Sequence, residues 1–460
     1  RESRIACIGP AGEKLSLISS VINDHGRAAG RSGLGAVMGS KRLKAVVVRG
    51  DRPVPLADRA RVLELAKKYI ATMTGAAADT FRNYGTSGFT AGSIQVGDAP
   101  VKNWDGTALD FPNREAISDH AVIALERRKY GCWRCPLRCG GVMKAGSGEY
   151  RWTAGVHKPE YETLAAFGSM CLNDNLPSIV KFNDICNRYG LDTISAGATV
   201  AFAIECYENG LLSKQETDGL ELTWGNHRAM VALTLRMARR QGFGDVLADG
   251  VKRAAERIGR GSERFAMHIQ GQEVPMHDPK RGPDYGTTYQ TDATPARHTQ
   301  GHEGFVPPEF PVPQFDRKAY AGRGLAHRMA ATTAHVVNAS GMCLFGYSCM
   351  HARALPDLLS AVTGWEYDLQ TIQAAGERIA CLRQMANIRE GLNPLKFAVP
   401  GRIIGKPPQE AGPLKGRTVD LETMAREFYL SMGWDPETGM PSHARLEELG
   451  LDAMLQYVGV

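Results

Sequence analysis

Three cysteines close together constrain this chain more than any other feature of its sequence. Cys132, Cys135 and Cys139 have the spacing C-x2-C-x3-C. Thiolates held this close repel one another unless a cation binds them, so the spacing indicates a metal or iron–sulfur site. Zinc and unligated structural thiols are the alternatives, although zinc ribbons use two separated C-x2-C pairs and the chain has no second pair. An iron–sulfur cluster needs a fourth ligand from elsewhere in the chain.

The bulk composition sets limits on the class of protein. The chain has 460 residues, enough for two or three domains, and ten cysteines, too few for a disulfide scaffold. A metal-type motif favours a reducing compartment, so we expect the cytoplasm, with periplasmic metalloproteins as the alternative. The net charge of +6 is spread without long basic runs, which gives no indication of nucleic-acid binding. No apolar run approaches the ~20 residues of a membrane span.

The first 55 residues contain a glycine-rich segment between two short apolar strands. We expect a strand at residues 4–9, a buried strand at 45–50, and glycines from 30 to 39 that allow close backbone approach. Arg27, Arg31 and Lys41 with the exposed amides suit an anion. A Walker loop fails because Ser40 precedes Lys41, and a dinucleotide fingerprint fails because Gly35 and Gly39 are too far apart. A tight glycine turn packed inside a sheet domain is the other interpretation.

Two segments carry a resemblance to a known family. Residues 9–13 (G-P-A-G-E) and 27–41 (R-A-A-G-R-S-G-L-G-A-V-M-G-S-K) resemble the tungsten-containing aldehyde:ferredoxin oxidoreductase family, and the resemblance covers essentially the whole chain. It implies an α+β fold. Residues 1–55 would be the C-terminal part of a β-rich domain that cradles two tungstopterins, followed by mainly helical domains at 56–266 and 267–460. The chain opens like the middle of a folded domain, so we expect the earlier part of that first domain, with further pterin contacts, to be absent.

The resemblance also implies a complete set of cluster ligands. In the family the three cysteines bind a [4Fe-4S] cluster. Residues 338–345 resemble the motif D-x-x-G-L-C, whose cysteine is the fourth ligand and corresponds to Cys343 here, with Cys349 as the rival. We expect the remaining cysteines to be buried small hydrophobic residues: Cys7, Cys171, Cys186, Cys206 and Cys381.

The family's pterin contacts correspond to three segments of this chain. On local grounds Gly190 ends one helix and Asp192 or Thr193 caps the next. Asn187 and Asn338 replace family aspartates, so we expect pterin hydrogen bonding of altered polarity. The metal would be tungsten or molybdenum held by the dithiolene sulfurs of two pterins, with Mg²⁺ as a further ion bridging the pterin phosphates. The implied cofactor-binding residues are Arg31, Ser32, Gly33, Asn187, Gly190, Leu191, Asp192, Asn338, Gly341 and Met342.

A helix start supplies the predicted catalytic acid. Pro159 suits the first turn of a helix, and Glu160 and Glu162 lie where the helix dipole favours acids, which is the ordinary interpretation. In the family the second Glu of this Glu-Tyr-Glu stretch lies over the metal and transfers protons. The resemblance therefore assigns that role to Glu162, with Tyr161 as a neighbouring site residue.

A histidine near the metal is the other catalytic residue that the resemblance implies. It would polarise the substrate carbonyl, and His298 is the first choice, with His302 second. On local grounds a single histidine in a loop is more often an ordinary surface residue.

The implied reaction is the oxidation of an aldehyde to a carboxylic acid, with electrons leaving through the cluster to ferredoxin or an iron–sulfur partner subunit. A low-potential reduction of a carboxylic acid or aromatic acyl-CoA on the same scaffold is one alternative. A cluster-only electron-transfer subunit is another. The C-terminal residues 428–451 favour the aldehyde-oxidising branch. We expect an aldehyde substrate and a homo- or hetero-oligomer, without nucleic-acid partners or a membrane span.

Overall fold

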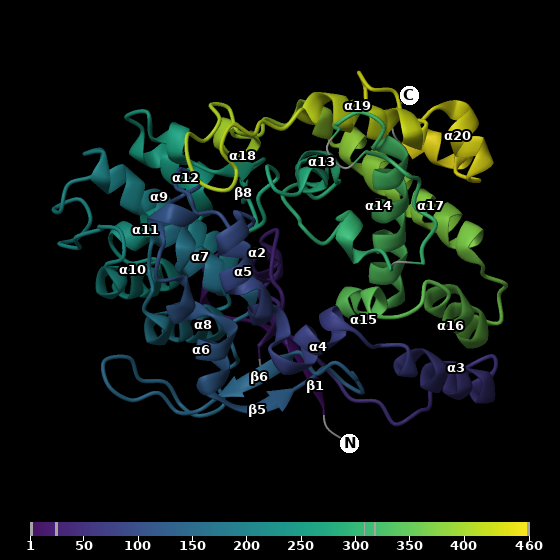
Figure 1. The fold of residues 1–460 in the computed structure, drawn as a ribbon, viewed down its shortest axis with the longest axis horizontal. Helices are drawn as coiled ribbons and strands as arrows, with labels where there is room; N and C mark the ends of the chain where they lie inside the picture. Colours follow the sequence, from purple (N-terminus) through teal and green to yellow (C-terminus); the bar gives the residue numbers. More distant parts are fainter. Residues whose placement is uncertain (1–2, 24–25, 308, 317–318, 458–460) are drawn as a thin grey trace. The chain divides into compact units, whose positions relative to one another are not determined.

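The computed structural model describes residues 3–23, 26–307, 309–316 and 319–457, and the chain divides into two compact units (Figure 1). The first unit combines Arg1–Arg52, Thr80–Arg281 and Pro400–Arg417. The second combines Pro53–Asp79, Gly282–Val399 and Thr418–Val460. Helices and short sheets occur together, which confirms the α+β class. The division at residues 55 and 266 stays a prediction.

A four-stranded antiparallel sheet opens the first unit. Its strand order is β3-β2-β1-β4, and Ile5 of β1 pairs with Val47 of β4. β-Branched residues dominate the edge strand β4, where Val47 and Val48 are exposed. Both predicted strands are present, as β1 and β4. The expectation that the second strand is buried is wrong, because β4 lies at the edge of the sheet and Val46, Val47 and Val48 are exposed. The strand bounds are β1 (Arg4–Ile8), β2 (Val21–Asn23), β3 (Arg27–Ala29) and β4 (Ala45–Val48).

Glycines let this sheet region pack tightly against the following helices. Gly33 precedes α2 (Leu34–Ser40) with φ 66°, and a Cβ there would lie 2.7 Å from the carbonyl oxygen of Leu17. Gly190 has φ 74°, and a Cβ there would lie 2.8 Å from the amide nitrogen of Gly9. Both positions therefore exclude a side chain. The structure agrees with the tight-turn interpretation of the glycine segment.

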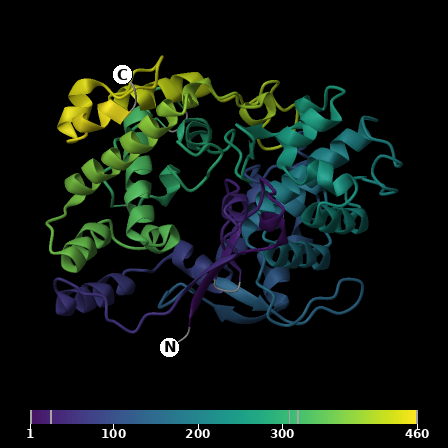
Figure 2. The ribbon, with the colours of Figure 1, turned by 180° about the vertical axis from the view of Figure 1, so that it is seen from behind.

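The helical core of the first unit is built around α9 (Thr193–Glu208). This helix is buried on every side from Ile194 to Cys206, and its small residues allow close approach: a Cβ at Gly197 would lie 2.6 Å from the Cβ of Ala166. Seen from behind, the purple strands lie beside the teal helices of the same unit (Figure 2). The other elements are α1 (Pro10–Glu13), α5 (Thr90–Val96), α6 (Asp119–Ala124), α7 (Tyr161–Phe167), α8 (Leu176–Tyr189), α10 (His227–Arg239), α11 (Phe243–Leu247), α12 (Gly250–Ile258), α18 (Gly401–Ile404), β5 (Glu126–Tyr130), β6 (Gly140–Met143), β7 (His268–Ile269) and β8 (Gln272–Glu273).

The second unit is helical. Helix α14 (Gly324–Ser340) packs against α17 (Leu369–Arg389) and α19 (Leu421–Met432), and Phe428, Tyr429 and Trp434 are buried in its core. Helix α3 (Arg59–Ala71), predicted over residues 59–74, packs on α16 (Ala354–Thr363). The remaining helices are α4 (Ala76–Asn83), at the boundary between the two units, α13 (Pro283–Thr291), α15 (Leu344–Ser348) and α20 (His443–Glu448). In the described part of the chain, no helix has the length and apolar character that a membrane crossing requires.

Candidate active site and cluster loop

The three cysteines of the motif lie in a single hairpin loop. Strands β5 and β6 pair antiparallel, with Tyr130 opposite Gly140, and residues 131–139 connect them. The amide of Cys135 donates to the carbonyl of Cys132 at 3.0 Å, which closes a turn. Cys132 is exposed, Cys135 is half-buried and Cys139 is buried, and none of the three forms a disulfide. Three thiols outside any disulfide on one short loop suit the ligation of a cluster.

Arg27 lies beside the innermost of these sulfurs. Its Nη2 is 3.6 Å from the Sγ of Cys139, and its Nη1 is 3.0 Å from Oε1 of Glu160. Burial favours the neutral guanidinium, but Glu160 and Cys139 together hold the pKa of Arg27 above its usual range. A fixed cation this close favours the thiolate form of Cys139. From the sequence, Arg27 was expected only to be one of several basic residues suited to an anion.

Glu162 occupies the predicted place in the first turn of α7. The helix begins at Tyr161, two residues after the predicted start at Pro159, so Glu162 lies in the first turn whereas Glu160 precedes the helix. Oε2 of Glu162 accepts a hydrogen bond from the amide of Met276 at 2.9 Å. Burial raises the pKa of Glu162, and the charge of His277 opposes that rise. A carboxyl with a raised pKa can exchange a proton nearer neutral pH than an exposed one.

His277 is a site residue that sequence reasoning missed. Its Nε2 lies 3.5 Å from Oε1 of Glu162, and its Nδ1 lies 2.9 Å from Oδ2 of Asp98. The ring of Tyr161 stacks on the imidazole with centroids 4.7 Å apart, and the hydroxyl of Tyr161 donates to the carbonyl of Met276 at 2.5 Å. The amide of Asp278 donates to the carbonyl of Asp98 at 2.7 Å. Asp98, His277 and Glu162 therefore form a carboxylate–imidazole–carboxylate chain. The only sequence signal was a loop rich in histidine between residues 267 and 313.

A buried charge network occupies the predicted pterin segments of the first unit. Nε of Arg31 donates to Oδ2 of Asp192 at 3.1 Å, and Nη2 donates to the carbonyl of Glu273 at 2.5 Å. Asp192 caps α9 by accepting from the amide of Ile194 at 3.1 Å, and Gly190 ends α8, as predicted. Leu191, between them, is buried.

Ser32 and Asn187 are two further predicted contacts of this unit. The hydroxyl of Ser32, which is exposed, donates to Oε1 of Gln272 at 2.8 Å. Asn187 lies half-buried in the last turn of α8. The structure thus brings Arg31 and Asp192 into direct contact, whereas their role toward a pterin stays a prediction.

The remaining predicted site residues lie in the second unit. Asn338 is in the last turn of α14 and donates to Oε1 of Gln300 at 3.2 Å. Cys343 is exposed and precedes α15. His298 lies half-buried in the loop after α13. His302, the alternative to His298, pairs with a carboxylate of the same unit: its Nδ1 lies 2.5 Å from Oδ2 of Asp284. Gly341 (φ 73°) ends α14, and Met342 is half-buried.

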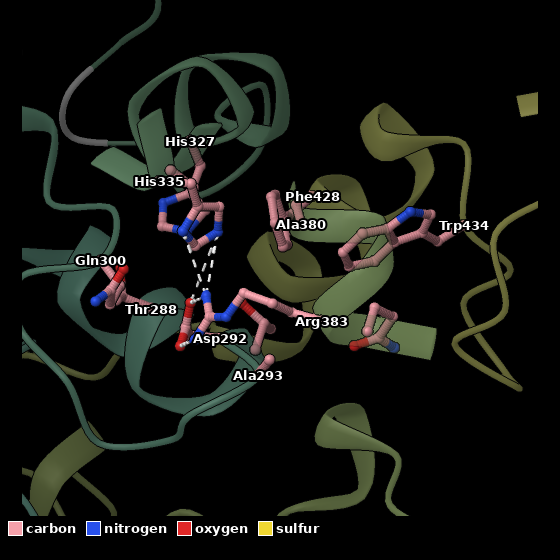
Figure 3. Close-up of a pocket in the computed structure, with 13 residues that line it drawn as sticks. Thr288, Asp292, Ala293, Gln300, His327, His335, Ala380, Arg383, Phe428 and Trp434 are labelled. Atoms are coloured by element: carbon pink, nitrogen blue, oxygen red, sulfur yellow. Dashed lines mark hydrogen bonds and ion pairs between the residues drawn. The ribbon is translucent and has the colours of Figure 1, made fainter. Parts of the chain in front are cut away.

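A small polar cavity of about 20 Å³ lies inside the second unit (Figure 3). Arg383 and Asp292 form a two-pronged ion pair there, with N–O distances of 2.8 and 2.9 Å. Nη1 of Arg383 also lies 3.3 Å from Nδ1 of His335. Burial lowers the pKa of both His327 and His335 to about 4, so both rings are neutral at pH 7. The volume suits a single water molecule, and sequence reasoning did not predict this cluster.

The thiols of the cysteine loop suit the ligation of a cluster, and the half-buried chain of Asp98, His277 and Glu162 can transfer protons. Residues 1–50 match the sequence model of the aldehyde ferredoxin oxidoreductase N-terminal domain, and residues 62–451 match that of domains 2 and 3 of the same enzyme family. The chain belongs to the aldehyde ferredoxin oxidoreductase family, and it is an oxidoreductase. The family expected from residues 9–13 and 27–41 is thereby confirmed.

Individual relatives agree with this assignment. The tungsten-containing aldehyde ferredoxin oxidoreductase of Pyrococcus furiosus is 33% identical over 456 residues, which cover 97% of this chain and 73% of the relative. The aliphatic sulfonate oxidoreductase WOR-like subunit of the same organism is 28% identical over 480 residues, covering 98% and 70%. Among solved structures, the active-site complex BamBC of benzoyl coenzyme A reductase with 1,5-dienoyl-CoA matches with a TM-score of 0.78. That match covers 100% of this chain and 74% of the other at 23% identity, and it shows a shared fold.

Proposed function

We propose that this chain binds a tungstopterin and oxidises aldehydes by the reaction R–CHO + H₂O → R–COOH + 2H⁺ + 2e⁻. Family membership supports the cofactor and the substrate class, because relatives that cover nearly the whole chain are tungsten-containing aldehyde ferredoxin oxidoreductases. The observation that carries the proposal is the chain formed by Asp98, His277 and Glu162 in the first unit. The reaction releases two protons, and this chain supplies groups that can take them up.

The residues present suit the proposed cofactor. Arg31, Ser32 and Asp192 offer guanidinium, hydroxyl and carboxylate groups, which are the kinds of group that hydrogen-bond a pterin ring and its phosphate. A tungsten or molybdenum pterin held by these residues would supply a two-electron acceptor, and Mg²⁺ would be a further ion of the same cofactor. Asn187 and Asn338 would contribute amide hydrogen bonds in place of carboxylates.

The cysteine loop suits a [4Fe-4S] cluster. Its thiols come from Cys132, Cys135 and Cys139, and we keep Cys343 as the predicted fourth ligand. When bound, such a cluster passes on electrons one at a time. Ferredoxin or an iron–sulfur partner subunit would receive them. Arg27 would help to keep Cys139 in the thiolate form that cluster binding requires.

Three side chains of the first unit, Glu162, His277 and Asp98, would carry out the proton transfers of this reaction. Glu162 accepts a proton from the attacking water, and burial makes its carboxylate a stronger base than an exposed one. Nδ1–H of His277 donates to Asp98, which leaves Nε2 to receive the proton from Glu162 and pass it outward. Asp98 stabilises the imidazolium formed in this step, and the stacked ring of Tyr161 keeps the imidazole in place. His298 stays the predicted group for orienting the carbonyl.

The proposal is tested with the full-length protein purified without oxygen. We expect tungsten or molybdenum, pterin and iron in the purified protein, and oxidation of aldehydes with benzyl viologen as the electron acceptor. Glu162→Gln should abolish turnover and leave the metal content unchanged. Glu208→Gln, an exposed glutamate at the end of α9, is the matched control and should retain turnover.

Three results would contradict the proposal or a part of it. Iron without tungsten, molybdenum or pterin would indicate a cluster-only electron-transfer protein. Reduction of a carboxylic acid or an aromatic acyl-CoA without any aldehyde oxidation would reverse the direction of the reaction. Near-normal turnover of Glu162→Gln would remove its role as the base.

A further inference from the structure

We propose that the solvent-facing side of the cysteine loop is a docking surface for a negatively charged one-electron carrier protein. The surface, called here the arginine–tryptophan surface, consists of Arg127, Arg128, Trp133, Arg134 and Arg138, all of which are exposed. The inference rests on the proposed function, because it requires that the electrons of that reaction leave through a cluster on this loop.

An exposed tryptophan marks the centre of this surface. Trp133 is 74% exposed although it lies between Cys132 and Cys135. The guanidinium of Arg134 lies 4.9 Å from the centroid of the indole ring. An exposed cation–π contact of this kind contributes only about 0.5–1 kcal/mol, and most of the indole surface is in contact with water. Tryptophan and arginine are the residue types most often found as energetic anchors in protein interfaces.

The four arginines form an uncompensated positive charge. Within the described ranges, none of their guanidinium groups pairs with a carboxylate. Glu126, at the start of β5, is a carboxylate close to them in the sequence, but it pairs with two lysines. Its oxygens lie 3.3 Å from Nζ of Lys129 and 3.1 Å from Nζ of the buried Lys158. A positive surface without internal partners attracts an acidic protein and speeds its association.

Strand and loop geometry place these charges next to the thiols. At about 3.3 Å per residue along a strand, Arg128 of β5 lies within about 13 Å of Cys132. Nη2 of Arg138 lies 3.5 Å from the carbonyl oxygen of Lys129, which brings the end of the loop back to the same strand. Cys132 is exposed, whereas Cys139 is buried beside Arg27. Cys132, the cysteine that reaches solvent, is therefore flanked along the chain by exposed arginines on both sides.

This arrangement favours an acidic electron carrier over a solvated loop without a partner. Electron transfer weakens steeply with distance, and a protein docked on Trp133 would approach the exposed Cys132 directly. Charge attraction brings the carrier in, and the indole provides the apolar contact that holds it. An acidic iron–sulfur protein has both the charge and the redox centre for this role.

The test compares a protein acceptor with a small dye. The holoenzyme oxidises an aldehyde with either a bacterial two-cluster ferredoxin of net negative charge or benzyl viologen. The variant is Arg127→Glu combined with Arg128→Glu, and Arg151→Glu, an exposed arginine of the same unit, is the matched control. Electrostatic steering accounts for about 10- to 1000-fold in association rate, so we expect kcat/KM for ferredoxin to fall at least tenfold at low ionic strength. The deficit should shrink as salt is added, and turnover with viologen should stay within twofold.

Binding of ferredoxin measured by calorimetry gives a readout that does not depend on turnover. The Kd should weaken at least tenfold in the double variant and in Trp133→Ala, with the EPR signal of the cluster verifying that each variant keeps its cluster. An unchanged Kd and an unchanged ferredoxin rate in the double variant would overturn the proposal. An equal loss in Arg151→Glu would also overturn it, because the effect would then come from total charge. If the parent protein binds ferredoxin but oxidises no aldehyde, the proposed reaction fails while the docking surface stands.

Discussion

Replacing Asp98 by asparagine removes the charge that faces His277 and changes little else. Oδ2 of Asp98 lies 2.9 Å from Nδ1 of His277, and the backbone of Asp98 is separately held by the amide of Asp278 at 2.7 Å. Asparagine has nearly the same volume and keeps the backbone contact. Its amide group can turn toward Nδ1 as a donor, which forces the imidazole into the opposite tautomer. Nε2 would then carry the proton and could not accept one from Glu162.

The size of the effect follows from the geometry of this contact. A hydrogen bond to a charged group contributes about 1.5–3 kcal/mol. The side chains of Asp98 and His277 are 18% and 16% exposed, so solvent screens only a small part of that energy. If the imidazolium forms in the rate-limiting step, this loss corresponds to a fall in kcat of about 10- to 150-fold. We expect the KM for the aldehyde to change less than twofold, because the change affects proton transfer.

The assay is aldehyde oxidation with viologen between pH 5 and 9, for the parent, Asp98→Asn and the exposed control Asp105→Asn. Metal content and the midpoint of thermal unfolding establish that the variants are loaded and folded. Nitrogen-15 NMR of the histidine side chains reports the tautomer of His277 independently of turnover, and we expect it to change only in Asp98→Asn. A kcat within twofold of the parent, together with an unchanged tautomer, would refute the reasoning.

Three further predictions concern the cluster and the stability of each unit. Cys343→Ala should abolish the EPR signal of the reduced cluster, and a retained signal would point to Cys349. Burial raises the pKa of Glu162, so the folded state loses stability as pH rises above the unfolded value of about 4.3. Glu162→Gln should therefore need more urea to unfold at pH 8, and a less stable variant would contradict this. His327 and His335 have pKa values of about 4 in the folded state. The stability that the protein gains by burying them as neutral rings is therefore fully present above about pH 6.5 and is lost as pH falls toward 4. One pKa unit corresponds to about 1.36 kcal/mol, so protonation of each histidine lowers the free energy of unfolding by up to about 3 kcal/mol. His335→Gln should flatten the fall in unfolding free energy between pH 7 and 4.5, measured by urea titration.

Features that depend on residues a few positions apart could be predicted from the sequence. The spacing of Cys132, Cys135 and Cys139 places three thiols on one loop whatever surrounds them. Gly190 ends a helix and Asp192 begins the next because capping is a local hydrogen-bonding requirement. Pro159 likewise indicated a helix start, which the structure places at Tyr161. The family resemblance was also carried by short motifs, at residues 9–13 and 27–41.

Only the tertiary structure decided which distant groups meet. His277 pairs with Asp98 across 179 positions, and Arg31 reaches Asp192 across 161. No local rule links such residues, because their contact depends on how α7, the loop after α5 and the loop before α13 pack in three dimensions. Burial also depends on distant parts of the chain. From the sequence, Glu162 is an ordinary acid in the first turn of a helix, and its pKa is raised because the folded chain surrounds it. The sequence by itself therefore determined the thiols, the caps and the family. Folding decided the proton chain and the exposed side of the cysteine loop, because both depend on long-range packing and solvent exclusion.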